Sequence, residues 1–290
     1  MPLPRLIAAV PTPLDDALRI SAEPLARHCK SLFSRGCEAV VLFGTTGEGT
    51  LFSASEKLQA LEDLIALGLE PSRLMVATGT SALSDTAFVV AGARDAGCFG
   101  SLVLPPFFTK QVDDQGLEAW FARLIAKTGA NASLFLYHIP AISGVGFSPS
   151  LVKSLMQRHS AVVRGLKDSS ADSALAAASA DAGLPGIYVS TEVDLAANLA
   201  RGMAGTISAS INLTLPRVVR ALKAGVPDPS IAHLRKHLAD HSLIWAVKTA
   251  LWRETGDDIW RRMAPPHMPP SGVSEHAFLQ SLEELQMASA

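Results

Sequence analysis

The stretch Ala39-Val-Val-Leu-Phe-Gly-Thr-Thr-Gly-Glu-Gly-Thr-Leu-Phe-Ser-Ala-Ser-Glu56 contains the repeating unit of the fold. Its first part, Ala39–Phe43, is wholly apolar, as expected for a strand that is buried on both faces of a parallel sheet. Glycines in the next segment, Gly44–Gly49, allow a tight turn. The last four residues, Ser53–Glu56, match a capping box, which starts a helix. The stretch therefore predicts one strand followed by one helix.

Similar apolar runs recur along the chain, separated by helical patterns. They are Leu6–Val10, Ala39–Phe43, Leu74–Ala77, Ser101–Leu104, Ser133–Tyr137, Val162–Lys167, Gly186–Ser190 and Gly205–Ser208. This alternation is typical of an open doubly wound sheet and of a (β/α)8 TIM barrel, and the count of eight favours the barrel. We assign residues 1–213 to an α/β barrel and residues 214–290, which are helical and interrupted by prolines, to a C-terminal helical extension of the same domain.

The composition excludes several classes of protein. The 290 residues are 48% hydrophobic and 18% charged, enough apolar material for a large core, and the net charge of −2 attracts neither nucleic acid nor an anionic membrane. The sequence has no apolar stretch long enough to cross a bilayer. Its three cysteines have no metal-binding spacing and favour a reducing compartment. We therefore expect a cytoplasmic protein that has no nucleic-acid or membrane partner.

Active sites of (β/α)8 barrels lie at the carboxyl ends of the strands, so we expect the functional residues directly after the apolar runs. Thr45 and Thr46 follow the second run, within glycines whose exposed N–H groups would form a nest for a carboxylate. The alternative is an ordinary turn from a strand to a helix, because isolated glycine motifs are weak signals.

Two further residues end apolar runs. Lys167 ends the sixth run, where burial would penalise its charged form and make the neutral amine available to attack a carbonyl carbon. The alternative is a lysine on the rim, paired with Asp168. Tyr137 ends the fifth run, and a strand-end tyrosine is often a packed residue with a satisfied hydroxyl.

Together, the Gly-Thr-Thr-Gly-Glu turn, the Tyr137-x-x-Pro140 turn and Lys167-Asp168 follow runs two, five and six. In this order and spacing they resemble the pyruvate-dependent aldolase and synthase superfamily, which includes dihydrodipicolinate synthase and N-acetylneuraminate lyase. The resemblance extends from Leu6 to Asn212. It implies that Lys167 forms a Schiff base with a keto acid and that Tyr137 is the acid/base group, with a hydroxyl relay through Thr46. It also implies that Thr45, Thr46 and Gly47 bind the carboxylate of the keto acid.

Two positions depart from dihydrodipicolinate synthase. Phe108 stands where that enzyme has a second relay tyrosine, and Ile142 stands where it has an arginine that binds an acidic substrate. We therefore expect an aldolase or lyase that acts on pyruvate and a 2-keto-3-deoxy sugar acid or a sialic-acid-like compound. The alternatives are a sugar-acid dehydratase that uses the same lysine, dihydrodipicolinate synthase itself, and an inactive barrel that binds keto acids. An inactive barrel would not need an imine-forming amine.

The resemblance also implies contacts to the second substrate. Glu192, after the seventh run, is the expected contact to sugar hydroxyls. The other expected substrate-binding residues are Ser143, Ser210 and Ile207. His138 replaces an asparagine that is common in the superfamily, and the sequence assigns it no role.

The expected partners are pyruvate and an aldehyde, with no metal or nucleotide cofactor. The resemblance further implies a homotetramer, a dimer of dimers, with Phe107 and Phe108 near the tighter subunit contact. His233, His237 and His241 have a four-residue spacing that is compatible with a metal site, but no acidic residue lies at a matching position. We expect this histidine stripe to face solvent or another subunit.

Overall fold

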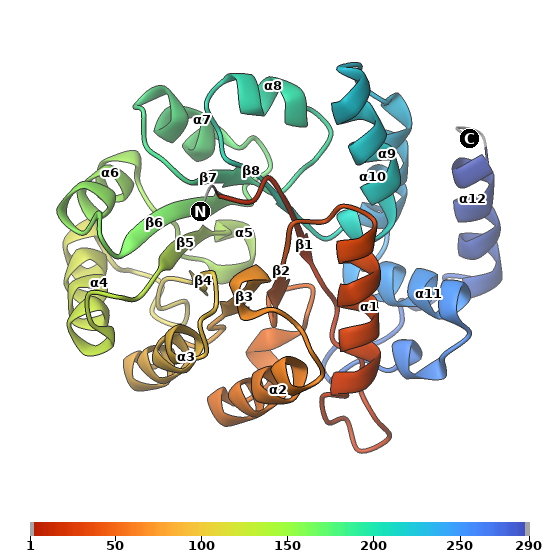
Figure 1. The fold of residues 1–290 in the computed structure, drawn as a ribbon, viewed down its shortest axis with the longest axis horizontal. Helices are drawn as coiled ribbons and strands as arrows, with labels where there is room; N and C mark the ends of the chain where they lie inside the picture. The colour runs from red at the N-terminus through yellow and green to blue at the C-terminus, as the bar shows by residue number, and fades with distance from the viewer. Residues whose placement is uncertain (1–2, 288–290) are drawn as a thin grey trace.

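The computed structural model describes residues 3–287 and contains one closed barrel of eight parallel strands. Each strand pairs with the next, and β8 returns to β1, where Ile7 is in register with Ile207. Figure 1 looks almost down the barrel and shows the helices around it. The predicted (β/α)8 barrel is confirmed, and the open doubly wound sheet is excluded.

Each strand begins and ends within one residue of the apolar run that predicted it. They are β1 (Leu6–Ala9), β2 (Ala39–Leu42), β3 (Leu74–Ala77), β4 (Gly100–Val103), β5 (Leu134–His138), β6 (Val163–Asp168), β7 (Ile187–Val189) and β8 (Gly205–Ser208). This agreement arises because both faces of each strand are covered, so that nearly every strand residue must be apolar.

Helices follow the strands in turn. They are α1 (Ala22–Ser34), α2 (Ala54–Ala66), α3 (Leu83–Asp95), α4 (Asp114–Thr128), α5 (Pro140–Ser143), α6 (Pro149–Arg158), α7 (Ala174–Asp181), α8 (Leu195–Ala200), α9 (Ile211–Ala224), α10 (Pro229–Ala239), α11 (Leu243–Thr255) and α12 (Glu275–Met287), with short 3₁₀ helices η1 (Gly49–Leu51), η2 (Pro71–Arg73) and η3 (Asp258–Arg261). The predicted capping box is present, since the Ser53 hydroxyl accepts from the Glu56 N–H and the Glu56 carboxylate accepts from the Ser53 N–H.

Side chains alternate between the barrel interior and the helical layer. The interior cluster includes Ile7, Val41, Met75, Phe135, Tyr188 and Ile207, so the barrel is a packed core and not a pore. Because the period of a strand is two, Tyr137 shares the inward face of β5 with Phe135, while Leu136 and His138 face outward. The same alternation turns Lys167 inward and Asp168 outward on β6.

The helical extension packs beside α1 and α9 (Figure 1). Helix α9 contacts β1 and completes the ring around the barrel, so the boundary predicted at residue 213 lies inside α9 and the extension begins with α10. Helices α10, α11 and α12 share an apolar cluster that includes Leu238, Trp245 and Phe278. Within residues 3–287, no helix has both the length and the apolar character required to cross a membrane.

Candidate active site

Lys167 and Tyr137 lie side by side at the carboxyl ends of β6 and β5. They are register partners, and Lys167 Nζ is 4.5 Å from the centre of the Tyr137 ring. The lysine is only 6% exposed. A buried amine on the inward face of a barrel strand is placed for chemistry at the mouth of the barrel.

Asp168 does not pair with Lys167. Its carboxylate faces outward and is fully buried, where it accepts hydrogen bonds from the Ser170 N–H (2.8 Å), the Ser170 hydroxyl and the Ala176 N–H (2.8 Å). The carboxylate thereby connects β6 to the first turn of α7. The alternative of a rim lysine paired with Asp168 is wrong, because neighbouring residues of a strand point to opposite faces.

The hydroxyl that contacts Tyr137 belongs to Thr45. Thr45 Oγ1 is 3.0 Å from the Tyr137 phenol oxygen. The sequence predicted a hydroxyl relay to Tyr137 through Thr46, but the hydroxyl in contact with Tyr137 is that of Thr45. Tyr137, Thr45 and Lys167 therefore form one continuous group that spans β5, β6 and the turn after β2.

The turn after β2 has a conformation that few sequences can adopt. Glu48 has a φ of 56° and Phe43 a φ of 57°, both in the left-handed region. A Cβ atom on Gly49 would lie 1.6 Å from the Phe43 carbonyl oxygen, so only glycine fits there. The N–H groups of Thr46 and Gly47 have no hydrogen-bond partner among residues 3–287, which leaves them available to an anion.

A narrow pocket lies beside Thr45 and Tyr137. Its lining residues are Phe43, Gly44, Thr45, Thr50, Ala77, Gly79, Leu102, Leu104 and Tyr137. The lining is mostly apolar, and Thr45, Thr50 and Tyr137 are its hydroxyl-bearing residues.

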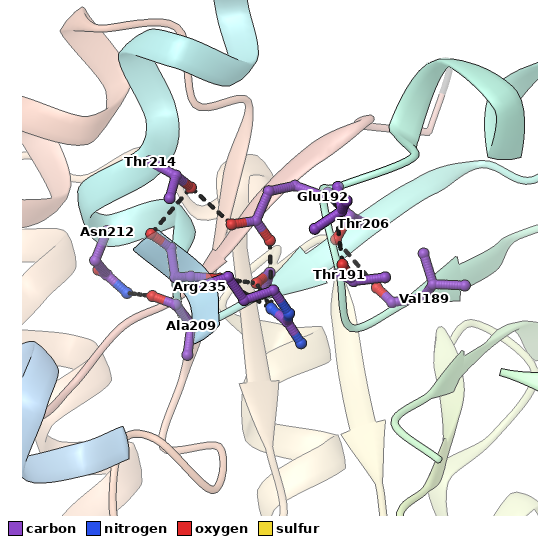
Figure 2. A network of polar contacts seen from close by, with 11 residues as sticks. Val189, Thr191, Glu192, Thr206, Ala209, Asn212, Thr214 and Arg235 are labelled. Carbon is purple, nitrogen blue, oxygen red and sulfur yellow. Dashed lines mark hydrogen bonds and ion pairs between the residues drawn. The ribbon is translucent and has the colours of Figure 1, made fainter. Parts of the chain in front are cut away.

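Glu192 and Ser210 belong to a different structure, a buried polar network outside the barrel (Figure 2). One carboxylate oxygen of Glu192 accepts from the Thr214 hydroxyl at 2.7 Å, and the other lies 3.5 Å from the Arg235 guanidinium. Arg235 also donates to the hydroxyls of Ser208 (3.0 Å) and Ser210 (2.9 Å). The expected substrate contacts of Glu192 and Ser210 are therefore not supported, because their polar atoms are engaged with α9 and α10.

The expected substrate contacts of Ser143 and Ile207 are also not supported, because their side chains are engaged within the protein. The Ser143 hydroxyl donates to the main chain, with Ile139 O at 3.0 Å and Val145 O at 2.6 Å, and it accepts from the Val145 N–H. Ile207 is completely buried in the barrel interior. The first residue stabilises the turn after β5, and the second packs the core.

His138 has a structural role that the sequence did not assign. Its ring faces outward, and Nδ1 accepts a hydrogen bond from the Phe147 N–H at 3.0 Å. Burial lowers the pKa of His138, and the Asp168 and Asp172 carboxylates oppose this effect. The residue therefore fixes the chain between Tyr137 and α6.

Phe108 and Ile142 are exposed apolar residues at the mouth of the barrel. They are 85% and 66% exposed, respectively. Lys110 connects their two loops, because its ammonium group donates to Phe107 O (2.5 Å) and Ser143 O (2.6 Å). The Ile142 side chain at the position of the synthase arginine is apolar, and the neighbouring Lys110 ammonium group is bound to two main-chain carbonyl oxygens.

The histidine stripe packs partly against the last helix. The His237 ring stacks on Phe278 with a centroid distance of 5.0 Å, and the His241 ring meets the same phenylalanine edge-on. His233 is exposed. Within the described part of the chain, no three His, Cys, Asp or Glu side chains are grouped as they would be around a metal ion.

Sequence reasoning missed a buried ion pair at the site. Lys248, on α11, pairs with Glu48 of the glycine-rich turn, and both side chains are almost completely buried. The available signal was a lysine inside the apolar segment Ile244–Leu251, since a buried charge must have a partner. The sequence did not identify the partner, Glu48, because it lies 200 positions away.

The fold and site define a class of protein: a (β/α)8 lyase with a lysine at the end of β6, next to a tyrosine from β5. Residues 2–253 match the Dihydrodipicolinate synthetase family. The chain belongs to this family and is a class I aldolase-type enzyme, a carbon–carbon lyase.

Individual relatives agree with this assignment. An uncharacterized DapA-like lyase of Chloroflexus aurantiacus is 35% identical over 220 residues, which cover 75% of this chain and 73% of the relative. A 4-hydroxy-tetrahydrodipicolinate synthase of Prochlorococcus marinus is 33% identical over 155 residues, 53% of this chain and about half (51%) of the relative. The crystal structure of dihydrodipicolinate synthase from Agrobacterium tumefaciens superposes with a TM-score of 0.89 at 32% identity, covering 98% of this chain and 99% of that one.

Proposed function

We propose that the protein forms an imine between Lys167 and pyruvate and uses it to make or break a carbon–carbon bond. The neutral amine adds to the keto carbon to give a carbinolamine. The carbinolamine hydroxyl takes up a proton from the Tyr137 phenol and leaves as water, which gives the protonated imine. This cation is an electron sink, so the adjacent carbon loses a proton to give an enamine, which attacks an aldehyde; cleavage is the reverse. The imine itself supplies the electron sink, so this chemistry requires no metal or nucleotide cofactor.

The observation that carries the proposal is the group formed by Lys167, Tyr137 and Thr45. The Tyr137 phenol, 3.0 Å from Thr45 Oγ1, is the proton donor and acceptor for the carbinolamine and the aldehyde oxygen. The N–H groups of Thr46 and Gly47, which have no hydrogen-bond partner among residues 3–287, bind the keto-acid carboxylate.

Ile142 is apolar and cannot form an ion pair with a carboxylate of the aldehyde component. An uncharged aldehyde therefore fits better at this position. Such an aldehyde is released when a 2-keto-3-deoxy sugar acid or a sialic-acid-like compound is cleaved. Two other reactions use the same imine. A synthase reaction is favoured by the identity to named synthases, and a dehydratase reaction by Phe108 in place of the second tyrosine.

The test is borohydride reduction in the presence of pyruvate, followed by intact-mass analysis and peptide mapping. The expected product is one reduced pyruvyl adduct on Lys167 that is absent from the Lys167→Ala variant. Lys57 is the rival amine, because it is buried and burial lowers its pKa to about 8. An adduct on Lys57, or no adduct although pyruvate binds by calorimetry, would overturn the proposal.

The three reactions are separated by their products. Cleavage releases pyruvate from the sugar acid, dehydration keeps the carbon skeleton, and the synthase reaction consumes pyruvate together with aspartate semialdehyde. Mass spectrometry of the products with each substrate identifies which one occurs.

We also propose that the protein assembles into a homotetramer in which Phe107 and Phe108 lie near the tighter contact. Phe108 and Ile142 are 85% and 66% exposed on two loops that Lys110 connects, and a group of exposed apolar side chains is typical of a surface that another subunit covers. Light scattering that reports a monomer at micromolar concentration would contradict it.

A further inference from the structure

The turn after β2 carries backbone strain that its own residues cannot maintain. Phe43 and Glu48 both have left-handed φ values, 57° and 56°, although neither is a glycine. Such conformations are unfavourable for residues with a Cβ atom and persist only where the surrounding structure fixes them. The contacts that fix this turn are therefore part of how the site is built.

The C-terminal region supplies contacts on one side of the turn. The Glu48 carboxylate pairs with Lys248 of α11 through one oxygen and accepts the Ala264 N–H at 2.7 Å through the other. Lys248 also donates to Arg262 O at 2.6 Å, which fixes the direction of its ammonium group. Burial lowers the pKa of Lys248, and the Glu48 carboxylate opposes this effect.

The amino-terminal segment supplies a contact on the other side. The Thr12 hydroxyl donates to the Gly47 carbonyl oxygen at 2.7 Å. Inside the turn, the Glu48 N–H donates to Thr45 O and the Gly49 N–H donates to Gly44 O. Thr45 and Thr46 thus lie between two anchored residues, Gly44 and Gly47, and their orientation depends on those anchors.

We propose that Lys248 is a positioning residue of the active site, which acts through Glu48 to hold the turn that directs the Thr45 hydroxyl toward Tyr137. The same contact orients the N–H groups of Thr46 and Gly47 toward the substrate carboxylate. The ligand in this inference rests on the proposed function, whereas the coupling of Lys248 to the turn does not.

The competing interpretation is that the ion pair only stabilises the fold. Removal of one partner from a buried pair leaves an uncompensated charge, whereas simultaneous neutralisation of both partners is often tolerated. The double variant Glu48→Gln/Lys248→Met therefore separates the two interpretations. It removes the buried charges but also removes the charged contact that positions the turn.

The experiment compares the wild type, Lys248→Met and the double variant by three measurements. These are thermal unfolding, the pyruvate concentration that gives half-maximal borohydride trapping, and hydrogen exchange of peptides from residues 43–51. Arg253→Met is the matched control, because Arg253 lies on the same helix and its ion pair with Glu283 is exposed.

The expected result for Lys248→Met is a rise in the half-saturating pyruvate concentration of about ten- to a hundred-fold, with Lys167 still labelled at saturation. Hydrogen exchange of the turn accelerates by about ten-fold or more, because its internal bonds open more often. In the double variant thermal stability recovers, while trapping and exchange remain altered. Arg253→Met leaves pyruvate trapping and hydrogen exchange of the turn at their wild-type values.

The proposal would be overturned if hydrogen exchange and pyruvate trapping in the double variant equalled those of the wild type. If Lys248→Met does not fold, the double variant alone decides. If the wild type forms no pyruvate adduct, the proposed function fails, and hydrogen exchange still tests whether Lys248 holds the turn.

Discussion

The ring of Tyr137 contacts Lys167, and its hydroxyl contacts Thr45. Lys167 Nζ lies 4.5 Å from the centre of the ring, and the phenol oxygen lies 3.0 Å from the Thr45 hydroxyl. One side chain therefore connects the proposed nucleophile on β6 with the turn after β2. A substrate atom attached to Lys167 comes within the region where the phenol can transfer a proton.

Replacement of Tyr137 by phenylalanine should separate imine formation from turnover. The variant keeps the ring beside Lys167 but loses the proton-transferring hydroxyl, so turnover should fall by about 10²- to 10⁴-fold. Borohydride trapping of pyruvate on Lys167 should persist at long incubation. A variant that turns over at the wild-type rate would remove Tyr137 from the mechanism.

The two adjacent threonines should behave differently. Thr45→Val removes the hydroxyl that contacts Tyr137, and turnover should fall by about ten-fold or more. Thr46→Val is the matched comparison, because the hydroxyl that contacts Tyr137 is that of Thr45 and the substitution retains the Thr46 N–H. Its main effect should be on the pyruvate half-saturation concentration. Equal losses of turnover in the two variants would show that the observed Thr45 contact is not the relevant one.

Glu192→Gln should change stability and not the affinity for the second substrate. The substitution weakens the contacts of the carboxylate with Arg235 and Thr214, at an expected cost of about 1–3 kcal/mol in the free energy of unfolding. Urea denaturation measures this cost. Asp194→Asn is the control, because Asp194 lies in the same loop and is exposed. A large rise in KM for a sugar acid at unchanged stability would return Glu192 to the substrate site.

His28 should make the protein sensitive to mild acid. Its ring is buried and 2.7 Å from the Asn212 side chain, and burial lowers its pKa to about 4. The unfolded chain binds a proton near pH 6.5, so the unfolded state carries more protons between that pH and about 4. Stability therefore falls as the pH decreases through this window, by about 3 kcal/mol in total.

Urea denaturation at pH 7.5 and at pH 5 measures this loss. Other groups also titrate in this range, so the comparison is with His28→Gln, which should show a smaller pH dependence than the wild type. Identical slopes in the two proteins would mean that His28 is not the sensitive group.

Introduction of an arginine at Ile142 should change the preference for the second substrate. The side chain is exposed at the mouth of the barrel, so an arginine fits without repacking of the core. If the apolar residue excludes acidic aldehydes, Ile142→Arg should raise kcat/KM for aspartate semialdehyde by about ten-fold or more. Ile142→Gln, which is polar but uncharged, is the control. No gain with arginine would place specificity elsewhere in the site.

The sequence predicted the strands well because burial on both faces requires apolar residues at nearly every position of a strand. The predictions for Tyr137 and Lys167 placed them at adjacent strand ends for the same reason. The choice between Thr45 and Thr46 failed, because neighbouring residues in a turn point in directions that their identities do not encode. The contact of Glu192 with Arg235 was not predicted, because Arg235 comes from a helix that no local sequence pattern connects to β7.

The pair of Glu48 and Lys248 also has a consequence for biosynthesis. The two residues are 200 positions apart, and every group proposed for catalysis is translated before Lys248. A nascent chain that has emerged only as far as α9 possesses the amine, the phenol and the threonines, but its Glu48 has no cation to hold it. If Lys248 holds the turn as proposed, the site becomes ordered only after α11 has left the ribosome, and chains truncated before α11 lack an ordered site.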